Sequence, residues 1–412
     1  MKADVERIRS HLDNLSKFTA TPGAGCTRLS YTPEFRAACD YVADKARALG
    51  MTTRRDAVGN LRARLAGREE NAACVMVGSH LDTVINGGNF DGILGVVCGL
   101  ETVQSLIEAG RRPKRPIEVV VFAEEEGTTF RCPLAGSKAI TGKFTVEDLK
   151  ALKDEQGRSW YEALIAFGLQ PDDLPRDRIH PANIHAMLEL HIEQGAVLES
   201  ENLPVGIVEH IAGSENHRIR LTGRANHAGT TPMHLRRDAL AAAAEMILAV
   251  EGIAADTSRP RTVATVGRIH CLPNAPNVIP GRVEFSIDLR DVDDSRITEA
   301  ASLVRDAIGG ISSARGIAWE MELTGRSPPH PLSVKIAQRI ASLAAKAGIP
   351  HRTMMSGALH DAATLAEVTD VGMIFVPSRE GRSHTPKEWT NPEDIAPGAT
   401  LLLSSVATLA ED

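Results

Sequence analysis

Three short, continuous runs of apolar residues constrain the fold of this chain more than any other feature of its sequence. A strand has this pattern when both of its faces are buried, as in the parallel sheets of α/β domains. These runs and a fourth strand-like segment lie at 74–80 (CVMVGSH), 117–123 (IEVVVFA), 372–377 (GMIFVP) and 186–191 (AMLELH). Segments with helical periodicity lie beside them, at 31–49, 92–109 and 331–348. The order predicts an α/β domain with a mostly parallel or mixed sheet.

The pattern changes near Gly213, where polar and apolar residues begin to alternate. NHRIRLTGRA, TVATVGRIH and RVEFSIDLRDV all alternate in this way, which is typical of strands covered on one face only. Helical stretches at 237–251 and 294–308 lie between them. The order strand, helix, strand, strand, helix, strand predicts an inserted α+β, ferredoxin-like domain at 213–328. The first domain is then discontinuous, at 1–212 and 329–412, and two domains are expected because one core rarely grows beyond roughly 300 residues.

The composition excludes several classes of protein. The chain has 46 Lys and Arg against 53 Asp and Glu, a net charge of −7, and only 4% aromatic residues. We therefore expect no nucleic-acid partner, which would need a basic surface or stacking platforms. No run approaches the roughly 18 apolar residues of a membrane span, and the amino-terminal segment predicts an amphipathic helix instead of a signal peptide. Six scattered cysteines without a CxxC pair indicate reduced thiols in a cytoplasmic protein.

Histidine and carboxylate residues follow the predicted strands. Strand ends or the turns after them carry His80, Asp82, Glu124, Glu125, Glu126, His191 and, after a longer loop, His384, while Asp91 lies in the glycine-containing segment GGNFDG. In an open α/β sheet, ligand-binding groups gather beyond the carboxyl ends of the strands. We therefore expect these side chains to form one site.

The residue types of this site favour a pair of divalent cations. Imidazole and carboxylate together suit zinc or a similar first-row metal, and two ions that share a carboxylate activate a water molecule between them. We assign Asp91 as the shared carboxylate, Glu126 as a metal ligand and Glu125 as the general base. Burial is expected to raise the pKa of Glu125. Asp82 is expected to accept the second N–H of His80 and so fix its tautomer.

Each of these elements also has a simpler explanation when it is taken alone. A single histidine at a strand end is most often structural, and a run of three glutamates is usually a solvated edge. Short motifs carry a real rate of false matches. The co-occurrence of the residues at several strand ends is what favours a catalytic site.

The ordered motifs resemble one branch of a known family. GSHLDTV, FDG, EEEGTTF, LELHIEQGAVLE, GRANHAGTTPM, NAPNVIPG, SGALHDA and SREGRSHTP occur in this order along nearly the whole chain. They are similar to the amidase/hydantoinase–carbamoylase branch of the M20 metallopeptidases. The resemblance implies a zinc-peptidase-like catalytic domain with an inserted lid, and a homodimer formed through the lids.

The same resemblance implies a ligand set and two metal ions per subunit. His80, Asp91 and His191 would hold one ion, and Asp91, Glu126 and His384 the other. Glu125 matches the general base of the family and Asp82 its histidine-orienting carboxylate. Zinc, manganese, cobalt and nickel can all use such ligands. The resemblance also implies a cis peptide bond between Asp91 and Gly92.

Further residues match substrate-binding positions of the family. In the lid, His227 matches the residue that reaches the partner's active site and stabilises the oxyanion, and Asn277 and Arg290 match substrate contacts. The planar guanidinium of Arg290 suits a substrate carboxylate, although a surface charge is the simpler interpretation. In the other domain the matching residues are Gln194, Gly357 and His360. A substrate held by both domains would favour a closed state.

The predicted activity is hydrolysis of a linear ureido or amide C–N bond in a small carboxylate. VINGGNFDG, AEEEG and NHAGTTPM most resemble the allantoate subgroup of this family, which implies allantoate as the substrate, and N-carbamoyl-L-amino acids or β-ureidopropionate are the alternatives. Leu359 stands where a second glycine is expected in relatives, which is predicted to narrow the pocket. A non-catalytic protein that binds a ureido ligand is a different class of function, but Glu125 and all the ligands are present. The HIEQG and NHAGTTPM motifs disfavour an aminopeptidase.

Overall fold

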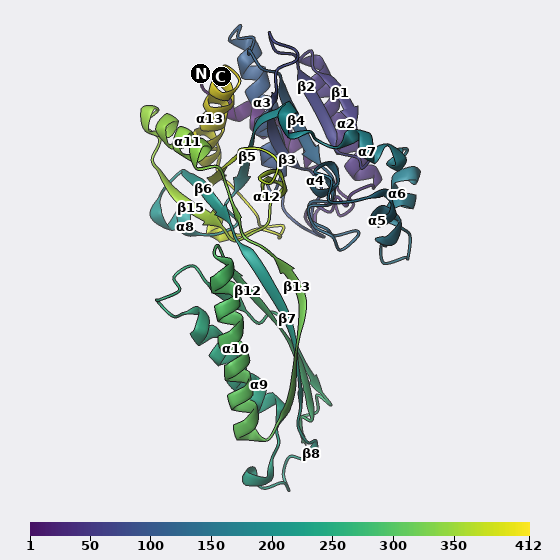
Figure 1. Ribbon diagram of the computed structural model, residues 1–412, viewed down its shortest axis with the longest axis vertical. Coiled ribbons are helices and arrows are strands. Elements are labelled where there is room, and N and C mark those ends of the chain that lie inside the picture. The colour runs from purple at the N-terminus through teal and green to yellow at the C-terminus, as the bar shows by residue number, and fades with distance from the viewer. The chain divides into compact units, whose positions relative to one another are not determined.

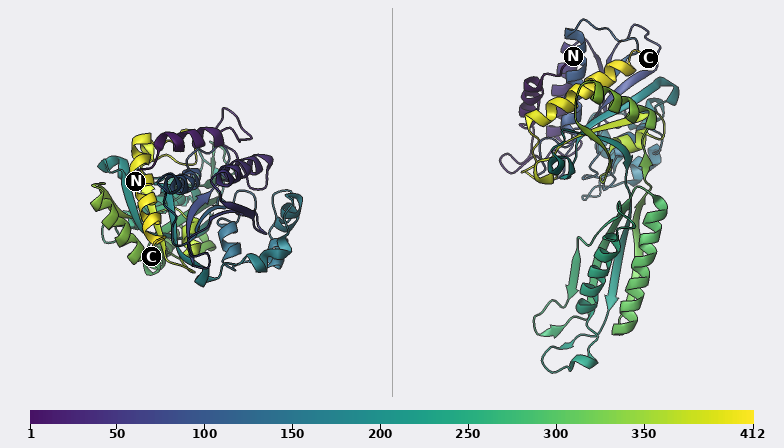
Figure 2. Two further views of the ribbon diagram at one scale, coloured as in Figure 1. Left: turned by 90° about the horizontal axis from the view of Figure 1, so that it is seen from above. Right: turned by 90° about the vertical axis from the view of Figure 1, so that its left-hand side faces the viewer.

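The chain divides into two compact units. The computed structural model describes residues 1–412, with unit 1 formed by Met1–Glu209 and Leu332–Asp412 and unit 2 by His210–Pro331 (Figure 1). Unit 1 carries both termini of the chain (Figure 2).

Unit 1 is built on a mixed sheet, as the sequence predicts. Its strands are β1 (Thr52–Arg55), β2 (Leu61–Leu65), β3 (Cys74–His80), β4 (Ile117–Phe122), β5 (Ile184–Ile192), β6 (Val205–Ile211), β15 (His351–Ser356) and β16 (Val371–Val376). The order is β1-β2-β4-β3-β5-β16-β6, and β15 also pairs with β6. The central strands β4, β3, β5 and β16 are parallel, and the outer pairings are antiparallel. Every residue of β3, β4 and β16 is buried, which explains their continuous apolar sequence.

Five longer helices share one core with this sheet. They are α1 (Val5–Leu15), α2 (Pro33–Ala48), α3 (Ile93–Glu108), α11 (Val334–Lys346) and α13 (Pro392–Leu409). Alternate residues of β3, such as Val75 and Val77, belong to this core, because successive side chains of a strand point to opposite faces. Helices α11 and α13 lie side by side (Figures 1 and 2). No helix of the chain has both the length and the apolar character needed to cross a bilayer.

Short helices complete unit 1. They are α4 (Ala135–Ile140), α5 (Val146–Ala151), α6 (Trp160–Ala166), η1 (Pro171–Asp173), α7 (Leu174–Asp177), η2 (Pro181–Asn183), α8 (Val197–Glu201), α12 (Asp361–Leu365) and η4 (Arg379–Gly381). Their ends are fixed locally: Thr145 with Asp148, and Ser159 with Glu162, form reciprocal capping boxes. Helices of this length show too few turns for hydrophobic periodicity to reveal them.

Unit 2 follows the predicted order of strands and helices, except that TVATVGRIH contributes to two short strands, β9 and β10, where one strand is predicted, and that three two-residue strands are added. Its strands are β7 (Gly213–Thr222), β8 (Asn226–His227), β9 (Val263–Thr265), β10 (Ile269–Leu272), β11 (Val278–Ile279), β12 (Arg282–Asp291), β13 (Ala318–Ser327) and β14 (His330–Pro331), and its helices are η3 (Met233–Leu235), α9 (Ala239–Ala254) and α10 (Asp294–Arg315). The main sheet is antiparallel with the order β10-β12-β7-β13. Helices α9 and α10 cover one face of it (Figure 2). The fold class, α/β with an α+β insert, is confirmed.

One-sided burial explains the alternating sequence of unit 2. Ile219 and Leu221 of β7 are buried in a core with Phe285 of β12, while the residues between them are more exposed. Met246 of α9 and Val304 of α10 close this core. Polar positions such as Arg220 and Glu284 therefore face away from the helices, as half-covered sheets require, whereas Glu215 and His217 are buried on the same face as Ile219.

A tight turn at Gly92 replaces the expected cis bond. The prediction of a cis Asp91–Gly92 bond is wrong, because the cis peptide bond of this chain is Leu272–Pro273. The Ile93 amide donates to the Asp91 carbonyl at 2.7 Å, and Gly92 has φ 67° and ψ −47°. These dihedrals are those of a γ-turn that suits glycine, which has no Cβ. The positive φ of Gly92 thus turns the chain into α3, and this turn needs no cis peptide bond.

Phe285→Ala should destabilise unit 2. Phe285 is 0% exposed, and truncation of a buried phenylalanine typically costs about 3–5 kcal/mol of unfolding free energy. Leu323 on β13 is 54% exposed, so Leu323→Ala is a matched control that should cost less than about 0.5 kcal/mol. Urea unfolding followed by circular dichroism measures both. Equal effects of the two substitutions would contradict the core described for unit 2.

Candidate metal centre and active site

The carboxyl ends of four neighbouring parallel strands meet at one edge of the unit 1 sheet. Glu124–Glu126 follow β4, and His80 is the last residue of β3. His191 is the second-to-last residue of β5, and His384 lies in the loop after β16. Because β4, β3, β5 and β16 are adjacent in this order, their ends bring these residues together. Asp91 joins them from the loop that precedes α3.

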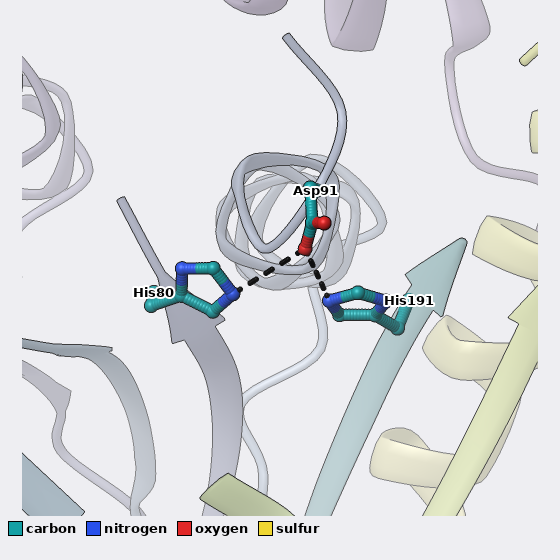
Figure 3. A group of neighbouring side chains, drawn as sticks. All are labelled: His80, Asp91 and His191. Carbon is teal, nitrogen blue, oxygen red and sulfur yellow. Dashed lines mark ion pairs between the residues drawn. The ribbon is translucent and has the colours of Figure 1, made fainter. Parts of the chain in front are cut away.

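Asp91 lies between three imidazole rings. Its Oδ1 is 3.6 Å from His80 Nε2 and 3.1 Å from His191 Nε2, and Figure 3 shows both rings pointing toward this oxygen. Its Oδ2 is 3.1 Å from His384 Nε2. The two oxygens of one carboxylate therefore face different histidines, which is the geometry that a shared metal ligand needs.

Two groups of ligand atoms share Asp91. His80, Asp91 and His191 form one, and Asp91, Glu126 and His384 form the other, with the ligand atoms of each group within 4.8 Å of one another. Glu126 Oε2 lies 3.5 Å from His384 Nε2. Imidazole nitrogen with carboxylate oxygen is a donor set that zinc and related divalent ions accept. The residues present thus fit a metal in each group.

Glu125 stands beside the first group without belonging to either. Its Oε2 is 3.6 Å from His80 Nε2, and the residue is only 7% exposed. Burial raises the pKa of Glu125 well above its usual value, although His80 opposes the shift. A buried carboxyl group of raised pKa next to a candidate metal site suits a general base.

Burial and neighbouring charged groups shift the pKa values of the side chains in this site. Burial disfavours ionisation of Asp91, but hydrogen bonds from His191, His384 and His80 outweigh it and keep the pKa of Asp91 well below its usual value. The hydrogen bond to Asp91 raises the pKa of His384 to about 9. Burial raises the pKa of Glu126 to about 7. A cation is thus favoured between these groups, either a proton or a metal ion.

Backbone carbonyls orient two of the rings. His80 Nδ1 lies 2.9 Å from the carbonyl oxygen of Asp82, and His191 Nδ1 lies 2.9 Å from the carbonyl oxygen of Ile192. When each Nδ1–H donates to its carbonyl, Nε2 is left as the nitrogen that faces Asp91. Fixed tautomers of this kind are common among metal-binding histidines.

The position of Asp82 corrects one detail of the sequence analysis. Its carboxylate Oδ1 is 3.9 Å from His80 Nδ1, so the hydrogen-bond partner of His80 is the main chain of Asp82 and not its side chain. The reason is that the carboxylate turns toward the loop after β4, where Oδ2 accepts the Glu126 amide at 3.1 Å. Asp82 therefore fixes the ring of His80 with its backbone and the Glu126 loop with its side chain.

Gln194 and His360 lie close to the candidate metal ligands. Gln194 Nε2 donates to Asp91 Oδ2 at 2.7 Å. His360 is 1% exposed, its ring centroid lies 4.4 Å from that of His191, and its Nε2 is 2.8 Å from Ser356 Oγ. Burial lowers the pKa of His360 well below its usual value, so its ring is neutral. Gly357 is exposed, and its substrate-binding role stays a prediction, as do those of Gln194 and His360.

The other predicted substrate residues belong to unit 2. His227, on β8, is exposed, and its Nδ1 accepts the amides of Gly229 at 3.0 Å and Thr230 at 3.3 Å. The neutral ring therefore carries its proton on Nε2, where it is a hydrogen-bond donor. Asn277 accepts the Ala228 amide with its backbone carbonyl.

Arg290 already has a carboxylate partner within unit 2. Its Nε donates to Asp288 Oδ1 at 2.8 Å and its Nη2 to Asp288 Oδ2 at 3.1 Å, and these bonds raise the pKa of Arg290. A substrate carboxylate would share this guanidinium with Asp288, and the substrate-binding role of Arg290 stays a prediction.

Two residues of the site escaped the sequence analysis. Ser383 Oγ is 2.8 Å from Asp91 Oδ2, and Glu388 accepts the Asp91 amide. Both flank His384 in SHTPKE, and this closeness in sequence was the one signal that could have suggested them. The first glutamate of the run, Glu124, is fully buried and accepts the amides of Thr129 and Phe130, so it is no solvated edge.

Comparison with known proteins decides the family. Residues 76–408 match the family described as peptidase family M20/M25/M40. The chain belongs to this M20 family. A solved amidase of the hydantoinase/carbamoylase family from Burkholderia multivorans superposes on it with a TM-score of 0.94 and 37% identity, covering 100% of this chain and 99% of the other.

Curated relatives of this M20 protein carry names of several amidohydrolases. An N-carbamoyl-L-amino acid amidohydrolase of Geobacillus stearothermophilus is 43% identical over 406 residues, which cover 98% of each chain. An allantoate amidohydrolase of Escherichia coli is 36% identical over 98% of each chain. The predicted resemblance and the predicted enzyme class, a hydrolase of C–N bonds, are confirmed.

Metal binding by this M20 protein should become tighter as the pH rises. His384, with a pKa of about 9, carries a proton at neutral pH that must leave before its ring can bind an ion. The apparent affinity of the chelator-treated protein for Mn²⁺ should therefore increase from pH 6 to pH 9. Calorimetry at pH 7 in buffers of different ionisation enthalpy counts the released protons, and His384→Ala should release fewer. An affinity that does not change over this range would contradict the assigned protonation.

Proposed function

We propose that this protein is a metal-dependent amidohydrolase that uses two divalent ions to cleave the C–N bond of a small ureido carboxylate. The observation that carries the proposal is the placement of Asp91, whose two oxygens face different imidazoles beside the buried Glu125. His80 and His191 complete one set of ligands, and Glu126 with His384 completes the other.

The proposed ions supply the electrophilic part of the chemistry. When bound, they would lower the pKa of a water molecule and polarise the carbonyl oxygen of the scissile bond. Glu125 accepts a proton from the attacking water as it adds to the carbonyl carbon. Glu125 then passes this proton to the leaving nitrogen, and the C–N bond breaks. For an N-carbamoyl substrate the products are the amino acid and carbamate, which decomposes to carbon dioxide and ammonia.

His227 is the proposed donor to the oxyanion. Its Nδ1 already accepts two backbone amides, so its Nε2–H is available to donate. Such a donor is worth roughly 10²–10³ in kcat when it is aimed at the developing charge. We propose that His227 of the partner subunit serves each active site in a homodimer. Asn277 and Arg290 are proposed to bind the substrate carboxylate.

N-carbamoyl-L-amino acids are the proposed substrates, with allantoate second. Three relatives with N-carbamoyl-L-amino acid names are 40–43% identical to this chain, against 36% for the allantoate amidohydrolases. This preference reverses the order favoured by short motifs, because the identities are counted over 97–99% of this chain, whereas the motifs cover only short segments of it. Six cysteines, all unpaired, fit the proposed cytoplasmic location.

Glu125→Gln should abolish turnover while metal binding persists. The substitution removes the proton acceptor but no proposed ligand, so kcat should fall by at least about 10³-fold with an unchanged metal content. Ammonia release from N-carbamoyl-L-amino acids and from allantoate, with Mn²⁺, Zn²⁺, Co²⁺ or Ni²⁺, is the measurement. Glu155→Gln, at an exposed glutamate, is the control and should keep full activity. If the wild type, with metal bound, hydrolyses none of these substrates, the proposed function is wrong.

Mixing two inactive variants should restore activity if His227 acts in the partner's site. In a mixed dimer of Glu125→Gln and His227→Ala, one site has both intact residues and the other has neither. Random exchange of subunits should thus give about a quarter of the wild-type rate. A mixture that stays as inactive as the separate variants, although native mass spectrometry shows mixed dimers, would assign His227 to its own subunit.

A further inference from the structure

Glu388 reaches from the His384 loop to the backbone that carries Asp91. It is 4% exposed, and its Oε1 accepts the amides of Phe90 at 2.9 Å and Asp91 at 3.0 Å. Unpaired buried amides are costly, so these two bonds fix the main chain of the loop where it presents Asp91. Glu388 itself lies outside both groups of candidate ligands.

The second oxygen of Glu388 connects to the side chain of Asp91. Glu388 Oε2 is 3.0 Å from Ser383 Oγ, which is 2.8 Å from Asp91 Oδ2. Gln194 Nε2 lies 2.7 Å from the same Asp91 oxygen and 3.3 Å from Ser383 Oγ. Ser383 has a single hydroxyl proton for two carboxylates, so Glu388 and Asp91 compete for it. Glu388 thus affects both the position of Asp91 and the hydrogen bonds that its Oδ2 accepts.

Gly88 provides the space that Glu388 occupies. A Cβ atom added at Gly88 would lie 2.1 Å from Glu388 Oε1 and 2.2 Å from its Cδ. Any other residue at position 88 would therefore displace the buried carboxylate. The two segments, 88–91 and 383–388, therefore pack closely against each other, although nearly 300 residues separate them in the sequence.

We propose that Glu388 is a positioning residue that keeps Asp91 and His384 in the relative positions that they need as ligands of the two ions. The proposal rests on the proposed two-ion function. Glu388 ties the main chain of one ligand loop to Ser383, the neighbour of His384 in the other loop. Hydrogen-bond partners of metal ligands typically change metal affinity or activity by roughly 10–100-fold when they are removed.

Substitutions at positions 388 and 88 separate positioning from a general effect on stability. Glu388→Ala removes all three hydrogen bonds, and Gly88→Ala displaces the carboxylate without changing Glu388. Glu388→Gln keeps an oxygen for the two amides, and its NH₂ group can donate to Ser383, whose proton then turns to Asp91. The conservative glutamine should thus rescue the position of Asp91. Glu393→Ala, at an exposed glutamate nearby, is the control.

The test measures ion binding and backbone protection as well as activity. Affinities for Co²⁺ and Zn²⁺ by chelator competition, the visible absorption of the Co²⁺ protein, and hydrogen exchange of peptides covering 88–92 in chelator-treated protein are compared. Glu388→Ala and Gly88→Ala should each lose roughly 10–100-fold in affinity for at least one ion, show an altered Co²⁺ spectrum and exchange faster at 88–92. Glu388→Gln should stay within roughly threefold of the wild type, and Glu393→Ala should match it.

Distinct outcomes separate the two proposals. Wild-type protein that binds no second ion would remove the proposed function. Wild-type protein that binds two ions, with folded Glu388→Ala and Gly88→Ala variants of unchanged affinity and Co²⁺ spectrum, would overturn the role of Glu388 alone. If Glu388→Ala does not fold, Gly88→Ala and Ser383→Ala decide: unchanged ion binding in both rejects the role, and weaker binding in both supports it.

Discussion

The attraction between one buried carboxylate and three imidazoles organises the candidate site of unit 1. Asp91 is 6% exposed, and its charge is retained only because His80, His191 and His384 surround it. Each of these histidines comes from a different part of the chain, so the interaction joins β3, β5 and the loop after β16. A carboxylate buried without such partners would become protonated.

The parallel sheet makes this arrangement possible. Adjacent parallel strands end at the same edge of the sheet. Beyond this edge the backbone no longer pairs with neighbouring strands, so its side chains can converge on one site. His80 and His191 therefore approach Asp91 from neighbouring strands, and the carbonyl groups of Asp82 and Ile192, one or two residues further along the chain, fix their rings. The loop of Glu125 and Glu126 is fixed in turn by the carboxylate of Asp82. Main-chain groups thus orient His80 and His191, and other side chains hold the carboxylate of Asp91.

The two units divide the predicted tasks. Unit 1 holds all the candidate ligands, the candidate base and the supporting residue Glu388. Unit 2 holds His227, Asn277 and Arg290, whose proposed contacts concern the substrate. The sheet of unit 2, covered by helices on one face, leaves polar side chains on the other.

The sequence by itself determined the four central strands of the sheet, the longer helices beside three of them, the order of the two kinds of domain, and the candidate ligands at the strand ends. These features follow from local periodicity and from the residues that end each strand, and both can be recognised in the sequence. Only the tertiary structure decided that the backbone of Asp82 orients His80, that Gly92 turns without a cis bond, and that Glu388 supports Asp91. These features depend on dihedral angles and on contacts between segments far apart in sequence, which no local pattern encodes.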